Sequence, residues 1–154
     1  LPPVAALAAD AVQRAGLAGR ISTHGGSFTQ DPLPRGADLV TLVRVAHDHP
    51  DATVRTLLRA IHEALPLGGA LLLAEPMAEA GGAPEPGDPY FHFYLLAMGA
   101  GRLRTPEALS ALMAEAGFTH IERVPNRFAL HAQILVGRKA RCLPANTAEC
   151  VNLN

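Results

Sequence analysis

Apolar residues recur at the spacing of an α-helix in three stretches of the chain, which predicts three amphipathic helices. The first helix runs from 4 to 15 and stops at Gly16. The second begins at Asp51, a residue suited to capping a helix, and ends at Pro66. The third begins with Thr105 as N-cap and Pro106 in the first turn. The expected inward positions are Val4, Leu7, Ala8, Ala11, Val12 and Ala15; Val54, Leu57, Leu58, Ile61 and Leu65; and Leu109, Leu112, Met113 and Ala116.

Other stretches have the pattern of β-strands. Residues 37–45 and 70–76 are nearly continuous apolar runs, typical of strands covered on both faces of a parallel sheet. With the helix between them they predict a βαβ unit. A short strand is expected to begin the stretch 20–28, and the stretches 120–126 and 129–139 are expected to form an antiparallel pair at the sheet's edge. The whole is an α/β fold over residues 1–139, followed by an irregular tail at 140–154.

Composition excludes several classes of function. The 154 residues are 49% hydrophobic and 18% charged, with a net charge of -1, so a globular domain is expected and nucleic acid or an anionic membrane surface is not an expected partner. Cys142 and Cys150 lack the spacing of a disulfide framework or a zinc site. No apolar run is long enough for a transmembrane helix, so a cytoplasmic location is expected.

In an open parallel sheet, ligands bind beyond the carboxyl ends of the strands, so polar residues just past each strand are candidates for a site. The second strand is followed by "HDHPD" at 47–51. His47 and His49 could bind a metal together with Asp48 or Asp51. Alternatively, Asp51 caps a helix and the histidines only end a strand. As a third alternative, His47 is a general base, and Asp48 could hold its ring or raise its basicity.

Two further stretches are candidates for the same rim. "GGSF" at 25–28 offers close backbone approach to a flat ligand, or only a turn. Glu75 ends the third strand, where it could act beside His47 or simply face solvent.

A Pro/Gly-rich loop at 78–89 lies where α/β enzymes usually have active-site lids. The aromatic segment after it, 90–101, is expected to be a helix. Its large residues have the spacing of an ordinary core, and behind such a loop they could also form a substrate wall. These residues are Phe91, Phe93, Tyr94 and Met98.

Four blocks together resemble the catalytic domain of S-adenosylmethionine-dependent small-molecule O-methyltransferases, the caffeate and acetylserotonin type. The blocks are "LPPVAALAADAVQRAGLAGRIS", "GGSF", "ADLVTLVRVAHDHPDATVRTLLRAIHEALPLGGALLLAEP" and "GRLRTPEALSALMAEAGF". The segment "YFHFYLLAMGAGRLRT" looks most like the bacterial carotenoid branch, the hydroxyneurosporene (demethylspheroidene) O-methyltransferases. The resemblance implies a Rossmann-like class I methyltransferase sheet with helices on both faces, S-adenosylmethionine as cofactor, and a small hydrophobic hydroxylated acceptor.

The resemblance also implies roles for individual residues. The family's base, the histidine of an "HDW" motif, matches His47, which is followed by Asp48, while His49 stands where tryptophan is usual. A glutamate that flanks the base in plant members falls at Leu103, so Glu75 is the remaining neighbour.

The cofactor residues implied by the resemblance are Gly26, Ser27, Phe28 and Arg44. Ser27 stands where the family has an acid that contacts adenine, and Arg44 where related enzymes have a lysine.

The family's glycine-rich cofactor loop, the acid that holds the ribose and the N-terminal dimerisation domain all come before the part that this sequence matches. We therefore expect this chain alone to bind S-adenosylmethionine poorly and the full-length enzyme to be a homodimer. The alternatives are an inactive Rossmann-like remnant or interaction module, and a metal-dependent hydrolase using His47 and His49.

Overall fold

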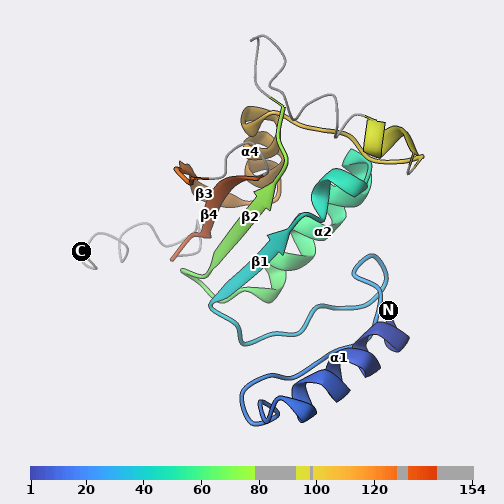
Figure 1. Ribbon diagram of the computed structural model, residues 1–154. Coiled ribbons are helices and arrows are strands. Elements are labelled where there is room, and N and C mark those ends of the chain that lie inside the picture. The colour runs from blue at the N-terminus through green and yellow to red at the C-terminus, as the bar shows by residue number, and fades with distance from the viewer. Residues whose placement is uncertain (79–92, 98, 128–131, 142–154) are drawn as a thin grey trace. The chain divides into compact units, whose positions relative to one another are not determined.

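The computed structural model describes residues 1–78, 93–97, 99–127 and 132–141, and its chain forms two compact units, Leu1–Pro34 and Arg35–Asn154 (Figure 1). Most of the predicted 78–89 loop and of the 140–154 tail lies outside the described residues, and so do both cysteines.

The first unit holds one helix, α1 (Pro2–Arg14), as the periodicity predicts. None of its residues is buried, and Leu7 is 71% exposed, so the expected inward stripe of this helix is uncovered within its own unit. The strand expected at the start of 20–28 is wrong, because that stretch has no strand conformation. A strand needs a hydrogen-bonded neighbour, and none of the residues that the structure describes pairs with it.

The second unit is a four-stranded mixed sheet in the order β1-β2-β4-β3. β1 (Leu39–Val43) and β2 (Ala70–Glu75) are parallel and joined through α2 (Asp51–Ala64), which confirms the βαβ unit. β4 (Gln133–Lys139) runs antiparallel to β2, and β3 (Phe118–Val124) runs antiparallel to β4. The antiparallel edge pair is therefore confirmed.

α2 and α4 (Pro106–Glu115) pack against the same face of this sheet (Figure 1). Thr105 caps α4, since its hydroxyl accepts the Ala108 N–H at 3.2 Å. The predicted inward positions of both helices are buried except Ala116: Val54, Leu57, Leu58, Ile61, Leu65, Leu109, Leu112 and Met113. Hydrophobic burial of this kind supplies most of the stability of such a layer.

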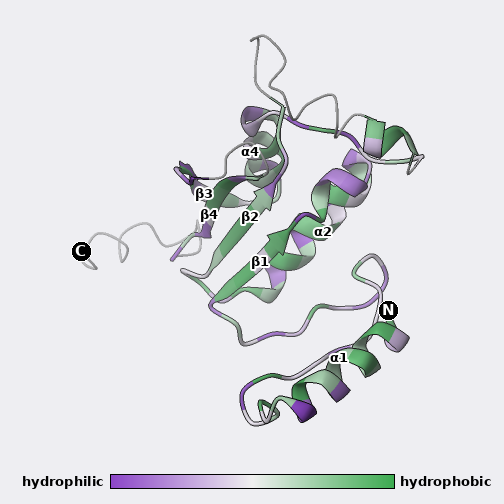
Figure 2. Ribbon diagram, in the orientation of Figure 1, coloured by the Kyte–Doolittle hydropathy of each residue, from purple (hydrophilic) through white to green (hydrophobic). Residues whose placement is uncertain are grey.

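Within the described residues of the second unit, β1 is covered on one face, whereas the sequence pattern predicts cover on both. Leu39 and Val43 are 51% and 57% exposed, while Leu42 between them is buried. Alternate residues of a strand point to opposite faces, and α2 and α4 cover only one. Figure 2 shows hydrophobic residues along β1 and β2. Within the described residues of this unit, helices cover only one face of these strands.

The C-terminal end of α2 is held by the half-buried ammonium group of Lys139. Lys139 Nζ donates to the carbonyls of His62 at 2.7 Å and Leu65 at 2.8 Å, which satisfies two of the helix's last acceptors. The His62 ring lies edge-on to Phe118, with centroids 5.1 Å apart. Burial lowers the pKa of the His62 imidazole, and the Lys139 ammonium lowers it further.

Candidate active site

The turn that follows β1 forms a small anion-binding nest. Arg44 has φ 56, a left-handed backbone, and Val45 returns to the right-handed region. This alternation points successive N–H groups to the same side. The parallel register pairs Val43 with Ala74, so Glu75 at the end of β2 lies opposite the turn.

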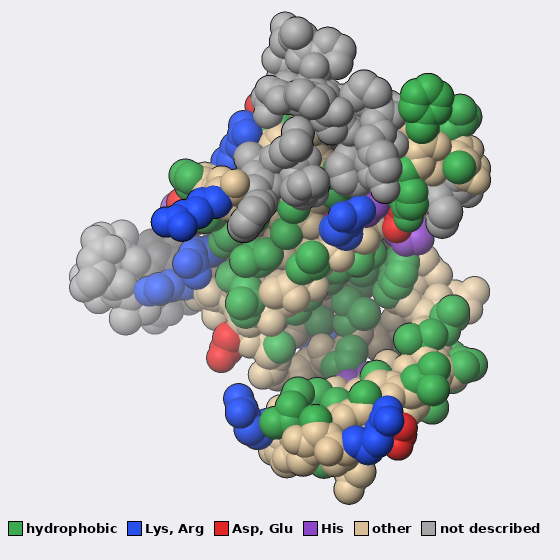
Figure 3. All heavy atoms as spheres, in the orientation of Figure 1, with side chains coloured by type: hydrophobic (Ala, Val, Ile, Leu, Met, Phe, Trp, Pro, Cys, Tyr) green, Lys and Arg blue, Asp and Glu red, His purple; other side chains and the backbone are tan. Residues whose placement is uncertain are grey.

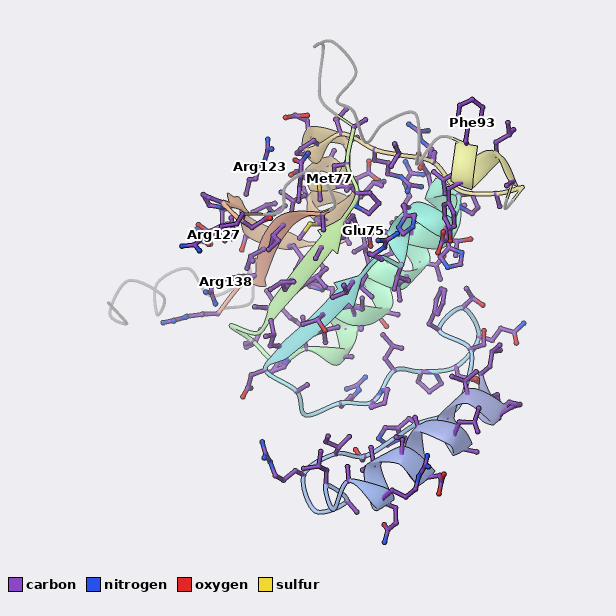
Figure 4. The ribbon with its side chains drawn as sticks, viewed as in Figure 1. Glu75, Met77, Phe93, Arg123, Arg127 and Arg138 are labelled. Carbon is purple, nitrogen blue, oxygen red and sulfur yellow. The ribbon has the colours of Figure 1, made fainter. Side chains whose placement is uncertain are left out.

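The carboxylate of Glu75 occupies that nest. Its Oε1 accepts the N–H groups of Val45 and Ala46, both at 2.8 Å, and its Oε2 accepts the His47 N–H at 3.3 Å. Glu75 is only 1% exposed, and Figure 4 shows its side chain between the two parallel strands and α2. Three backbone N–H groups thus converge on this one side chain, which fixes its position at the end of the turn.

The same carboxylate holds the ring of His47. Nδ1 of His47 lies 2.6 Å from Glu75 Oε2, and the residue, which belongs to the 3₁₀ turn η1 (Ala46–Asp48), is 3% exposed. A carboxylate accepts hydrogen bonds, so Nδ1 is the ring nitrogen that donates to Glu75. Nε2 then lies on the side of the ring away from Glu75.

Asp48 lies at the other ring nitrogen. Its Oδ1 is 3.3 Å from His47 Nε2, and that oxygen is buried without a hydrogen bond in the part of the chain that the structure describes. Sequence analysis expected Asp48 to hold the ring, whereas the short ring contact belongs to Glu75. A carboxylate at Nε2 can instead stabilise the imidazolium that forms when this nitrogen takes up a proton.

The backbone of His47 is also held by the segment that follows the 93–97 helical turn. Arg102 N–H donates to the His47 carbonyl at 2.9 Å. Gly101, with φ 93, lies so close that an added Cβ would collide with that carbonyl oxygen and would approach the Asp48 carbonyl carbon to 2.9 Å. Glycine is thus required here for close backbone approach.

Arg104 is a site residue that sequence reasoning missed. It is 3% exposed, and its guanidinium donates to the carbonyls of Ala46 at 2.9 Å and His49 at 2.7 Å, and to Asp51 Oδ1 at 2.9 and 2.7 Å. The only signal in the sequence is an arginine directly before the helix cap Thr105, inside a block that resembles the methyltransferases. Ala46, His49 and Asp51 lie more than 50 positions away, so no local pattern shows these partners.

Asp51 does not have the role that sequence analysis gave it. Pro50 is the N-cap of α2, and Asp51 is the first helical residue. Its carboxylate faces Arg104 and, at 3.5 Å, Arg102. The hydrogen bonds from Arg104 hold the pKa of the Asp51 carboxyl below its usual range.

The predicted substrate wall is described only in part. Residues 93–97 are helical, and the Tyr94 ring lies 6.2 Å from the His47 ring, centroid to centroid. Phe93 is 72% exposed and points away from the sheet (Figure 4), so its assignment to the core is wrong: one turn of helix buries only the side that faces Leu103. Phe91 and Met98 lie outside the described residues.

An apolar hollow of about 340 Å³ lies beside this helical turn. Its lining residues are Leu95, Leu96, Gly99, Ala100, Gly101 and Arg102. Figure 3 shows hydrophobic side chains gathered over the same segment. Since Gly101 and Arg102 also touch the His47 backbone, the hollow adjoins the proposed base. Leu103, where plant members have a glutamate, packs against Leu95 in an apolar cluster.

The predicted cofactor residues lie in two units. In the first, the Ser27 N–H donates to Asp31 Oδ2 at 2.8 Å and the Ser27 hydroxyl lies 2.9 Å from that of Thr29, so a local turn presents Gly26, Ser27 and Phe28. Arg44 belongs to the second unit, at the carboxyl end of β1.

Among residues 1–78, 93–97, 99–127 and 132–141, no group of three His, Cys, Asp or Glu side chains is arranged to bind a metal ion. Glu75 and Asp48 lie at the two ring nitrogens of His47, and the carbonyl of His49 binds Arg104. None of the helices described is long and apolar enough to cross a bilayer.

Comparison with known proteins identifies the family of this chain. Residues 1–119 match the family model of the O-methyltransferase domain. Among curated relatives, the demethylspheroidene O-methyltransferase of Cereibacter sphaeroides is 46% identical over 81% of the chain, and that of Rhodobacter capsulatus is 48% identical over 64%. The chain spans 33% and 25% of the length of these two proteins.

A solved structure, human N-acetylserotonin methyltransferase in complex with SAM, superposes with a TM-score of 0.71 at 28% identity, over 79% of this chain and 34% of its own. The mixed open sheet is that of the class I methyltransferases. The chain belongs to the O-methyltransferase domain family.

Proposed function

We propose that this chain supplies the catalytic base and the acceptor side of an S-adenosylmethionine-dependent O-methyltransferase, with His47 as the base. The observation that carries the proposal is the 2.6 Å contact between His47 Nδ1 and the buried Glu75 carboxylate. A carboxylate that fixes one imidazole nitrogen leaves the other as a base, the arrangement used in many general-base sites.

In this proposal, Nε2 of His47 takes the proton of the acceptor hydroxyl. Glu75 orients the ring, and Asp48 stabilises the imidazolium. An imidazole is too weak a base to ionise an aliphatic alcohol in advance, so proton transfer accompanies formation of the C–O bond. Positioning of the reactants supplies much of the remaining rate.

S-adenosylmethionine, when bound, supplies a methyl group on a positively charged sulfur. Within the second unit, Arg44 follows the carboxyl end of the parallel strand β1, where α/β proteins bind ligands. Gly26 and Ser27 belong to the first unit, where Gly26 has no side chain and Ser27 has a hydroxyl. Ser27 in place of an acid gives adenine a neutral partner instead of a charged one.

We propose a hydroxylated carotenoid as acceptor. The names of the two relatives at 46% and 48% identity support this choice, as does the apolar hollow beside the base. A largely apolar wall suits a long hydrocarbon, because removal of hydrocarbon surface from water favours binding. The homodimer and the cytoplasmic location stay predictions.

The test is methyl transfer by the full natural polypeptide that carries this sequence, with hydroxycarotenoid and phenolic acceptors. We expect His47→Ala to lower kcat about 100-fold or more, the usual contribution of a general base. The control is His120→Asn, at an exposed strand histidine with φ 48, a backbone that asparagine also adopts. A rate within about threefold of wild type for His47→Ala would remove the base assignment.

A further inference from the structure

We propose that Arg104 is a positioning residue for methyl transfer: it fixes the backbone of the His47 turn through its carbonyls, whereas Glu75 accepts from its N–H groups. This inference rests on the proposed role of His47 as the base. Arg104 touches no reacting atom, and it acts through the carbonyls at both ends of the turn.

The first step of the argument is where the guanidinium binds. Ala46 comes directly before His47, and His49 follows two residues later, and both carbonyls accept from Arg104, at 2.9 and 2.7 Å. The planar fork of an arginine fixes two such acceptors at a set separation, which a flexible ammonium cannot do. The turn that carries the base is therefore held at both ends by one rigid group.

The second step is charge. A guanidinium that is 3% exposed needs a counter-charge, and Asp51 supplies it through two bonds to Oδ1. Because Asp51 is the first residue of α2, the ion pair also joins the turn to the start of that helix. Loss of Arg104 would leave two carbonyls and one carboxylate without this donor.

The third step is how Arg104 itself is held. The Ala78 N–H donates to the Arg104 carbonyl at 3.0 Å, and Met77 forms a parallel bridge with Arg104. Figure 4 shows Met77 just beyond Glu75 on the same strand extension. The stretch 75–78 thus holds the base twice, through the Glu75 side chain and through the backbone of Arg104.

The expected consequence of losing this hold is a misplaced ring. With its carbonyls released, the η1 turn can rotate and lengthen the His47 Nδ1 contact with Glu75. Part of the population then has the proton on Nε2, where it blocks base catalysis. Misplacement by about 1 Å can cost about 100-fold in rate, so we expect kcat to fall by about tenfold to 100-fold while the KM for each substrate changes less than about twofold.

The experiment compares Arg104→Lys with Arg55→Lys in the full natural polypeptide. Arg55 forms an exposed ion pair with Glu115 at 2.9 Å, so its variant removes a guanidinium without touching the turn. We expect the kcat loss for Arg104→Lys alone. Selective ¹⁵N labelling of histidine reports the His47 tautomer without any turnover, and we expect a single Nδ1–H form in wild type and a mixture in Arg104→Lys.

A kcat within about twofold of wild type together with an unchanged His47 tautomer in Arg104→Lys would overturn the proposal. If that variant does not fold, Asp51→Asn is measured in the same way, because it removes only the counter-charge. We expect a smaller kcat loss of about threefold to tenfold and a detectable second tautomer, and wild-type behaviour in both measurements would overturn the proposal. A His47→Ala variant with nearly wild-type kcat would refute the role of His47 as the base. The His47 tautomer measured in Arg104→Lys would still test whether Arg104 positions the ring.

Discussion

Replacing Glu75 by glutamine tests the nest and the base together. Glutamine keeps the shape of the side chain and one carbonyl oxygen, which can still accept the N–H groups of Val45 and Ala46. Its amide NH₂ then faces the two donors that Oε2 accepts in wild type, the His47 N–H at 3.3 Å and Nδ1–H at 2.6 Å. An NH₂ group cannot accept a hydrogen bond, so the His47 N–H and Nδ1–H both lose the acceptor that they have in wild type.

The magnitude follows from these contacts. A buried donor left without an acceptor costs about 1–3 kcal/mol. The 3.3 Å bond is long and counts for little. The ring can escape the remaining conflict by moving its proton to Nε2, so that Nδ1 accepts from the amide. We therefore expect a loss of roughly 1–3 kcal/mol in the free energy of unfolding, and a much larger loss of activity, because the escape removes the basic lone pair.

The expected loss of kcat is on the order of 10²- to 10⁴-fold, the upper value being that of a wrong tautomer in a serine-protease triad. The assays are methyl transfer at saturating substrate and urea unfolding of the same protein. Glu115→Gln, which alters an exposed carboxylate, serves as the control and should change neither. A Glu75→Gln protein with wild-type kcat would refute the reasoning, whatever its stability.

Three further predictions concern other parts of the molecule. Gly101→Ala should lower kcat at least about tenfold, because the added Cβ collides with the His47 carbonyl. Gly99→Ala is the control, since Gly99 has φ 72 and open space around it and so has similar backbone strain without the collision. Equal rates for the two variants would count against the close approach of Gly101 to His47. Folding lowers the pKa of His62 below its ordinary 6.5. As the pH falls below 6.5, the unfolded chain therefore takes up a proton at His62 more readily than the folded chain does. The folded state is thus favoured most above pH 6.5, and its stability falls below that pH. Urea midpoints at pH 8 and 5.5 should therefore differ less in His62→Gln than in wild type, and an equal difference would disprove the assignment. Calorimetry should find only weak binding of S-adenosylmethionine by the 154-residue chain, and micromolar affinity would contradict this.

Much of the second unit could be predicted from local sequence patterns. The stripe of α2, the buried run of β2, the cap at Thr105 and the antiparallel pair each depend on neighbouring residues, and the structure confirms them. The period of apolar residues is sufficient to predict a helix or strand that buries one face against an element close to it in the sequence.

What the sequence could not show depends on contacts far along the chain. Asp48 adjoins His47 in sequence and does lie 3.3 Å from Nε2, but the short contact at Nδ1 comes from Glu75, which the register of β1 with β2 brings there. Arg104 binds two carbonyls, which every residue has, and an aspartate 53 positions away, so no local side-chain pattern points to it. The exposure of Leu39 and Val43 depends on which elements cover the sheet, and an apolar run does not contain that information.

The central claim is that His47 and Glu75 act as one unit, and a double-mutant cycle on kcat tests it most directly. Residues that act as a unit are strongly non-additive, because once the base is gone its orienting partner has nothing left to orient. We predict that His47→Ala with Glu75→Gln transfers methyl groups about as slowly as His47→Ala alone. A double variant slower by the product of the two single losses would show independent roles and would contradict the account.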